Sequence, residues 1–234
     1  MSDSTNQDFE ARRIAARKEV NALDKGALGS EPRREGFFNM VYDRAEGDGA
    51  QVPWADLAPK PQLAEWLTAN PAANGSMRAA DVACGLGDHA VAMQEAGYDT
   101  VGFDIAKTAI DWAKERFPDS GVNFTQGDLF NLPEDWVGGF ELVYECYTIQ
   151  AVPEAMHEDI SKAIASLVAP GGRLLIIART RKEDEEANGP PWHLKPSEYN
   201  IFKDLGFELD SEFNYVVTRS DKSIPHIFQV WKNT

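Results

Sequence analysis

The sequence predicts an α/β fold built on a doubly wound, mostly parallel sheet of seven strands, and three observations support this. Short apolar runs alternate with amphipathic stretches from about residue 78 onward, as strands alternate with helices around a parallel sheet. The run at 140–147 is almost continuously apolar, which is typical of a strand covered on both faces. The last two runs are joined by a short turn, so one C-terminal strand is expected to run antiparallel to the rest.

The individual elements follow from local sequence signals. Gly97 and Pro118 each end a helix, because glycine readily caps a helix end and proline cannot continue one. The expected strands are 78–84, 99–103, 122–125, 140–147, 173–178, 207–218 and 226–232. The expected helices among them are 88–96, 106–117, 153–168 and 197–205.

The N-terminal part is expected to be a helical cap or lid over the sheet. Residues 2–8 are polar and terminal, so we expect them to be disordered. A weakly periodic helix is expected over 9–25, and glycine, serine and proline between residues 26 and 32 end it. The sequence therefore predicts a cap over 1–70 and the main domain over 71–234, integrated into one structural unit.

Composition restricts the function. The formal net charge of −15 disfavours a nucleic-acid partner, because phosphate backbones are bound by basic surfaces. No apolar run approaches the roughly 20 residues of a membrane span, and the N-terminus lacks a signal-peptide core, so we expect a cytoplasmic protein without membrane association. Two cysteines, both in expected strands, and four histidines without ligand spacing predict neither a disulfide framework nor a metal site. A small-molecule partner is expected.

The stretch Ala80–Ala90 joins the first strand to a helix through a Gly85-x-Gly87 turn. Glycine lets the backbone approach a ligand closely, and the free N–H groups at the helix start favour a nucleotide there. The match Gly85-x-Gly87-x-x-Ala90 to the dinucleotide fingerprint is weak evidence alone. Asp104, which ends the second strand, would bind the ribose hydroxyls of NAD or of another adenosine ligand. An NAD-dependent oxidoreductase is therefore one alternative.

Asp81 distinguishes between these ligands. It lies inside the first strand, four residues before Gly85, where a dinucleotide site has an apolar residue. A buried carboxylate needs a partner, and the ammonium group of an amino-acid cofactor would serve directly or through water. Bonding to backbone N–H groups is the purely structural alternative.

Together these motifs resemble the class I S-adenosylmethionine-dependent methyltransferases. Their glycine motif has the form acid-x-G-x-G-x-G, and DVACGLG follows it with Ala83 in the first glycine place, a mild departure because alanine is small. The resemblance implies that Asp104 binds ribose and that Asp128 lies near adenine, with a helix-capping role and a turn role as their respective alternatives. The implied S-adenosylmethionine site comprises Trp54, Asp81, Ala83, Gly85, Gly87, Asp88, His89, Asp104, Ile105, Asp128, Leu129 and Glu145.

A narrower resemblance connects the ends of the chain with the thiopurine and halide/thiol methyltransferase group. Val52–Asp56 is similar to a tryptophan-containing entry segment, and Gly189–Leu194 to a segment after the fifth strand. This resemblance implies that the methyl acceptor is a small molecule with a thiol or another soft nucleophile. A small-molecule N- or O-methyltransferase and a non-catalytic cofactor-binding protein are the alternatives.

The carboxyl end of the fourth strand is the expected catalytic region, because ligands bind there in open α/β sheets. Glu145 is expected to contact the cofactor or to act as a base, with a solvated charge as the alternative, and Tyr147 is the second catalytic candidate. Gln150 and Val152 have no evident match in the family. The expected acceptor pocket comprises Phe37, Tyr42, Tyr147 and Trp192.

Overall fold

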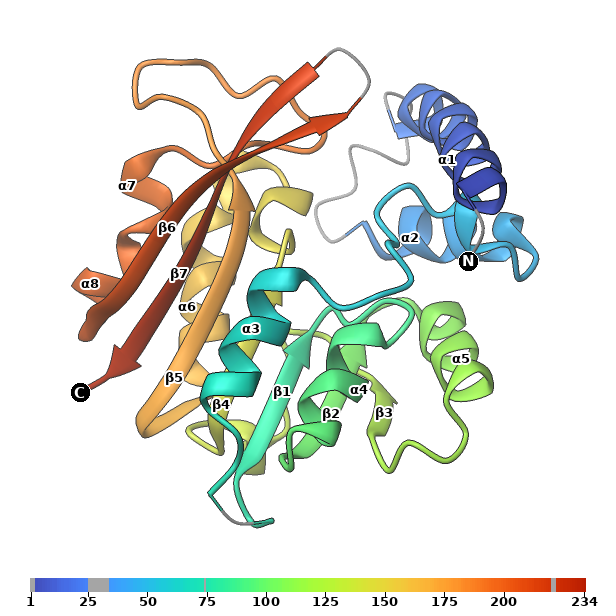
Figure 1. The fold of residues 1–234 in the computed structure, drawn as a ribbon. Helices are drawn as coiled ribbons and strands as arrows, with labels where there is room; N and C mark the ends of the chain where they lie inside the picture. The colour runs from blue at the N-terminus through green and yellow to red at the C-terminus, as the bar shows by residue number, and fades with distance from the viewer. Residues whose placement is uncertain (1–2, 25–33, 74, 220–221) are drawn as a thin grey trace.

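The computed structural model describes residues 3–24, 34–73, 75–219 and 222–234, and one seven-stranded sheet forms its centre (Figure 1). The strands lie in the order β3-β2-β1-β4-β5-β7-β6. They are β1 Arg78–Val82, β2 Asp99–Asp104, β3 Asn123–Gln126, β4 Phe140–Cys146, β5 Val168–Arg179, β6 Phe207–Arg219 and β7 Lys222–Asn233. Strands β1 to β5 pair in parallel, and β7 is antiparallel to both β5 and β6. The predicted doubly wound sheet is confirmed.

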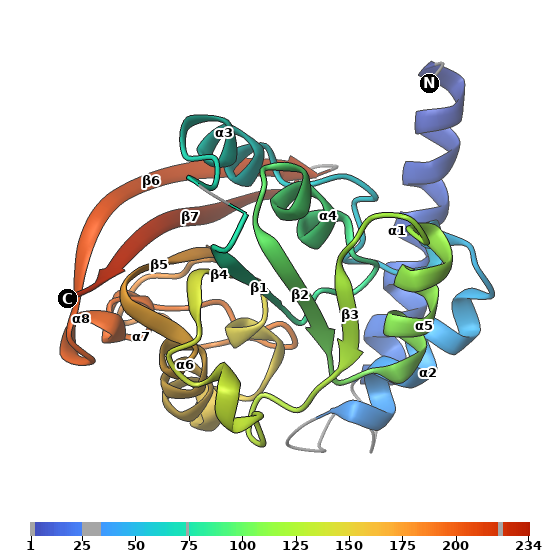
Figure 2. The ribbon, with the colours of Figure 1, turned by 90° about the horizontal axis from the view of Figure 1, so that it is seen from below.

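Helices cover both faces of the sheet. They are α3 Pro61–Ala69, α4 Asp88–Glu95, α5 Lys107–Arg116, α6 His157–Ser166, α7 Pro196–Tyr199 and α8 Ile201–Asp204. Seen from below, α3 and α4 lie on one face, and α6, α7 and α8 lie on the other (Figure 2). Helix α5 packs against β3 and α2, near the sheet edge.

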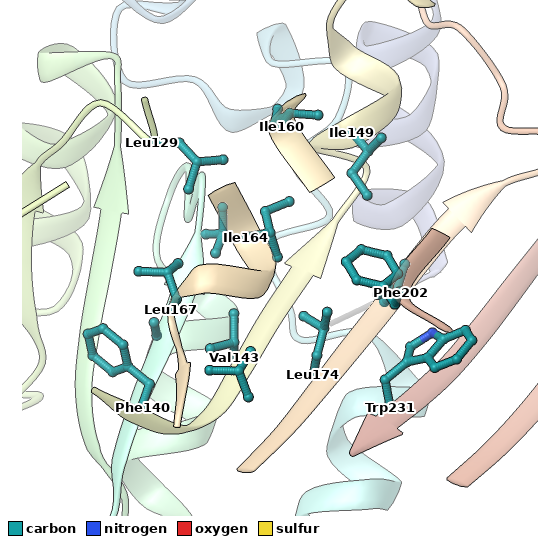
Figure 3. Packing of buried hydrophobic residues seen from close by; sticks show 14 of the residues in the cluster. Leu129, Phe140, Val143, Ile149, Ile160, Ile164, Leu167, Leu174, Phe202 and Trp231 are labelled. Atoms are coloured by element: carbon teal, nitrogen blue, oxygen red, sulfur yellow. The ribbon is translucent and has the colours of Figure 1, made fainter. Parts of the chain in front are cut away.

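The core between the sheet and α6 fixes which way the β4 side chains point. Val143 of β4 and Leu174 of β5 share one apolar cluster with Ile164 of α6 (Figure 3). Tyr144 belongs to the cluster on the opposite face, under α3 and α4. Because side chains alternate along a strand, Glu145 points to the same face as Val143.

Two expected helices differ from the observed ones. The helix expected over 153–168 begins as the 3₁₀ helix η5 (Glu154–Met156), continues as α6, and ends at Ser166. Strand β5 already starts at Val168, and its pairing with β4 shifts register between Phe140 and Leu142 to accommodate the Pro-Gly-Gly turn. The helix expected over 197–205 is divided into α7 and α8 at Asn200.

The N-terminal helices lie beyond the carboxyl ends of the parallel strands (Figure 1). They are α1 Asp3–Asp24 and α2 Glu35–Ala45, and the 3₁₀ helix η2 (Gly49–Gln51) follows. The expectation of disorder is wrong for residues 3–8, because they begin α1. Ion pairs of Arg12 with Asp48 and of Arg13 with Asp56 connect this helix to the segment between α2 and α3. The expected helix end at 26–32 lies outside the described residues, and the division at residue 70 stays a prediction.

Candidate active site

A cavity of about 320 Å³ opens where the carboxyl ends of the parallel strands meet the N-terminal helices. Strands β1 and β4 are neighbours at its floor, and the chain winds outward in opposite directions from them. Ligands in doubly wound sheets bind at such a switch point. The cavity volume lies in the range of small-molecule sites, about 300–1,000 Å³.

The turn after β1 has three residues in the left-handed backbone region: Ala83 (φ 53°), Gly85 (φ 52°) and Gly87 (φ 88°). Alanine at position 83 therefore differs from the glycine of the family motif in backbone strain as well as in size, because a residue with a side chain is strained in this region. A Cβ atom on Gly85 would lie 3.0 Å from the Tyr42 hydroxyl. A Cβ atom on Gly87 would lie 2.7 Å from the Phe124 ring, so Gly87 permits packing against β3 and does not line the cavity.

Asp81 lines the cavity, although only 1% of its surface is exposed. One carboxylate oxygen accepts the backbone N–H of Ala90, and Oδ2 has no hydrogen-bond partner among the residues that the structure describes. Burial raises the pKa of this carboxyl well above its usual value. A buried acceptor without a donor, facing a ligand cavity, fits the ammonium group of the expected cofactor.

Asp104 connects the glycine turn to the start of α5. Its Oδ2 accepts the backbone N–H of Gly85 at 3.0 Å, and its Oδ1 accepts that of Ala106 at 2.9 Å. Burial raises the pKa of Asp104 to about 6, against the effect of these hydrogen bonds. Asp104 thus has the structural role of closing the turn before α5 and also lines the cavity, as does Ile105, so both remain available to a ribose.

Tyr42 and Trp54 form one unit beside this turn. The Trp54 indole N–H donates to the Tyr42 hydroxyl at 2.9 Å, and the two rings pack edge to face. Burial, and secondarily the charge of Asp104, raise the pKa of Tyr42 well above its usual value. Both residues line the cavity, and the expected contact of Trp54 with a cofactor stays a prediction.

Most of the other predicted cofactor contacts also line the cavity: Ala83, Asp88, His89, Asp128 and Leu129. Asp88 forms a bidentate ion pair with Arg116 at 2.6 and 2.8 Å. Asp128 accepts the backbone N–H of Phe130 at 2.9 Å, a contact typical of a residue in a turn. The His89 Nε2 atom is buried without a hydrogen-bond partner in the described part of the chain. Burial lowers the pKa of His89 to about 3, so this imidazole is neutral at pH 7.

Glu145 and Tyr147 have different surroundings, although only one residue separates them. Glu145 is fully buried on the α6 face and is not part of the cavity lining. Its Oε2 accepts the N–H of Thr148 at 2.9 Å, and burial raises its pKa to about 8. Tyr147 lines the cavity with a left-handed backbone (φ 67°). The roles expected of the two residues stay predictions, and only Tyr147 is positioned to touch a ligand.

Aromatic and cationic side chains surround the end of the cavity nearest Tyr147. Lys60 Nζ lies 4.8 Å from the centre of the Tyr147 ring, and Arg179 Cζ lies 5.4 Å from it. On the cap side, Arg34 Cζ lies 4.4 Å from the Phe37 ring and 5.5 Å from the Trp192 ring. Phe37 lines the cavity, whereas Trp192 lies behind Arg34 and does not.

Arg34, Lys60 and Arg179 are not among the site residues that the sequence predicts. Arg179 had a usable signal, because it ends a strand at the ligand-binding edge of the sheet. No sequence signal marked Lys60, which lies between two prolines, or Arg34, which lies in the cap. Cys84 and Cys146, both free, complete the lining between the glycine turn and β4.

Residues 79–172 match a family model described as a methyltransferase domain. This match and the relatives below support an S-adenosylmethionine-dependent methyltransferase enzyme. It is 27% identical over 196 residues to "Probable thiol methyltransferase 2" of Arabidopsis thaliana, and the alignment covers 79% of this chain and 84% of that protein. It is also 32% identical to a thiopurine S-methyltransferase of Vibrio cholerae over 91 residues, which is 39% of this chain and 40% of that protein. The enzyme is thus related to the thiol and thiopurine methyltransferases.

Solved structures share the fold of this methyltransferase. One, from work on the conversion of a disulfide bond into a thioacetal group during echinomycin biosynthesis, superposes with a TM-score of 0.68 and 18% identity. That superposition covers 85% of this chain and 92% of the other. In the described parts of the enzyme, no helix has the length and apolar character to cross a membrane. Nor do His, Cys, Asp and Glu side chains gather there in a group of three that could hold a metal ion.

Proposed function

We propose that the enzyme methylates the sulfur of a small-molecule thiol. The observation that carries this proposal is the lack of an available general base beside Tyr147, within the described lining of the cavity. Amines and hydroxyls often need a base to remove a proton during methylation, whereas a thiolate needs little help. A site without such a base fits a soft nucleophile.

We call the end of the cavity nearest Tyr147 the acceptor end. Each carboxylate near it already has a strong partner. Asp56 pairs with both Arg13 and Lys60, and Asp24 pairs with Arg34. Glu145 is turned toward α6 and caps the turn that follows β4. His89, with its pKa near 3, is a weak base at neutral pH. Solvent water would therefore take up the proton of the acceptor thiol.

The acidic end of the cavity supports the placement of the cofactor. Asp81 would hold its ammonium group and Asp104 its ribose hydroxyls, while Trp54 and Tyr42 would cover it from the cap. When bound, S-adenosylmethionine supplies an electrophilic methyl group on a positively charged sulfur, and the C–S electron pair returns to that sulfur on transfer. The protein contributes alignment and exclusion of water. Residues 1–70 would act as the cap that closes the cavity.

The opposite end supports a thiolate. Lys60 and Arg179 approach the Tyr147 ring, and positive charge near a thiol favours its ionised form. The thiolate lone pair would form the new S–CH₃ bond without a proton transfer in the same step. Tyr147 would hold the acceptor against this edge of the cavity.

A panel of acceptors tests the proposal. Labelled S-adenosylmethionine would be incubated with the enzyme and matched aromatic thiols, phenols and anilines, together with iodide, at pH 8. We expect transfer to thiols to exceed transfer to the matched phenols by at least about 100-fold, because phenols remain largely protonated at that pH. Equal or faster transfer to phenols or anilines would overturn the thiol assignment while leaving the enzyme a methyltransferase.

A further inference from the structure

The acceptor end of the cavity contains more positive charge than one thiolate requires. We define the basic wall as Arg34, Lys60 and Arg179, all of which line the cavity. It stands in a protein whose formal net charge is −15. A local concentration of positive charge inside an acidic protein indicates an anionic ligand at that place.

Two members of the basic wall, Arg34 and Lys60, also form an ion pair with a carboxylate at this end. Asp56 pairs with Lys60 and also with Arg13, which lies outside the lining and has Glu10 as a further partner. Asp24 pairs with Arg34 through one terminal nitrogen, while the other terminal nitrogen donates to the carbonyl of Ala151 at 2.5 Å. The Nε–H of Arg34 is buried and has no hydrogen-bond partner among the described residues, although the residue is only 2% exposed.

Two members of the basic wall, Arg34 and Arg179, are connected through one short segment, the 3₁₀ helix η4 (Ile149–Ala151) that follows β4. Arg34 binds the carbonyl of Ala151, and the backbone N–H of Arg179 donates to the Gln150 side chain at 2.7 Å. The segment thus contacts both arginines of the basic wall. The two nearby histidines, His193 and His226, lose basicity through burial, and Arg179 lowers the pKa of each further.

Aromatic side chains also line this end, namely Phe37, Phe38 and Tyr147. Flat apolar surfaces next to guanidinium and ammonium groups suit a ring that carries an acid. A thiolate loses its charge on methylation, so by itself it would no longer attract the basic wall in the product. A carboxylate on the acceptor would keep its charge throughout.

We propose that the acceptor is an aromatic thiol bearing a separate carboxylate, which the basic wall of Arg34, Lys60 and Arg179 binds. This inference rests on the thiol acceptor proposed above. In the reaction, the sulfur forms the S–CH₃ bond, the C–S bond of the cofactor breaks with its electron pair on the departing sulfur, and the thiol proton goes to water. The carboxylate is unchanged and orients the ring.

The test compares 4-mercaptobenzoate with its methyl ester at pH 8, where both thiols are ionised. We expect kcat/KM for the acid to exceed that for the ester by about tenfold, which is typical of one charge-assisted hydrogen bond. Replacing Arg179 with glutamine (Arg179→Gln) should remove most of this preference, and Arg179→Lys should restore part of it. Lys60→Gln gives a second, independent variant.

Arg173→Gln is the matched control, because Arg173 lies on the same strand but outside the cavity and pairs with Asp210. It should leave the acid-to-ester ratio unchanged. Binding of S-adenosylhomocysteine, measured by calorimetry, reports that each variant is folded. Turnover of the ester as good as that of the acid would overturn this inference alone. Loss of turnover with both thiols, despite cofactor binding, would overturn the thiol acceptor and this inference together.

Discussion

The two ends of the cavity differ in charge and in how the chain builds them. The cofactor end gathers Asp81, Asp88, Asp104 and Asp128 at the ends of β1 to β3 and in the glycine turn. The acceptor end gathers Arg34, Lys60 and Arg179 from the cap, from the segment before α3 and from β5. A cofactor that carries a sulfonium and an ammonium group suits the first end, and an anionic acceptor suits the second. The difference suggests that charge sorts the two reactants before the methyl group moves.

The largest expected effect tests the acidic end. Asp81→Asn should weaken binding of S-adenosylhomocysteine by about 100-fold or more, because it removes the charged partner of a buried ammonium group. Calorimetry measures this, with Asp99→Asn, an exposed aspartate at the start of β2, as the control. The ligand-free variant should unfold at the same or a higher temperature than the wild type. Unchanged affinity would return Asp81 to a purely structural role and break the contrast between the ends.

Glu145 is buried outside the cavity lining and tests whether a carboxylate there takes part in the reaction. Its pKa rises from 4.5 to about 8 on folding, so the native state resists ionisation and the side chain costs stability as the pH rises through this window. Between pH 5 and 8, Glu145→Gln should therefore gain about 3 kcal/mol in stability relative to the wild type. Urea unfolding at several pH values measures the gain. A kcat that falls by more than about 100-fold in this variant would instead support the expected base role.

Ala83 allows the backbone of the cofactor end to be tested without a change in charge. Because its φ of 53° is strained for alanine, Ala83→Gly should stabilise the protein by about 1 kcal/mol. Ala80→Gly, in the interior of β1, should destabilise it instead. Thermal unfolding of both variants gives the comparison. A loss of stability in Ala83→Gly would show that the methyl group contributes packing that outweighs the strain.

The smallest expected effect is a different dependence of ligand binding on salt concentration at the two ends. Raising the salt concentration from about 0.05 to 0.5 M should increase KM for 4-mercaptobenzoate about threefold, because Lys60 and Arg179 are partly exposed and their charges are screened. KM for its methyl ester should stay nearly constant. The affinity for S-adenosylhomocysteine should also change little, since Asp81 and Asp104 are buried. Equal salt dependence of the acid and the ester would argue that the basic wall does not contact the acceptor.

The cofactor end could be predicted because its residues are close in sequence and attached to regular elements. Asp81 and Gly85 are four residues apart, and Asp104 ends the next strand, so the parallel pairing of β1 and β2 brings them together. Gly87 and Ala83 show the limit of that reasoning. Only the structure revealed that Gly87 makes room for Phe124 and that Ala83 has a left-handed backbone.

The sequence by itself determined the sheet, the order of its parallel units and the acids of the cofactor end, because strand periodicity and turn motifs are local signals. Tertiary structure alone decided the acceptor end. Arg34 reaches Ala151 across 117 residues of sequence, and no local pattern records such a contact. The direction in which Glu145 points was likewise decided by the packing of Val143 and Tyr144 into opposite cores. Long-range packing, rather than residue type, therefore placed Tyr147 in the cavity and Glu145 outside it.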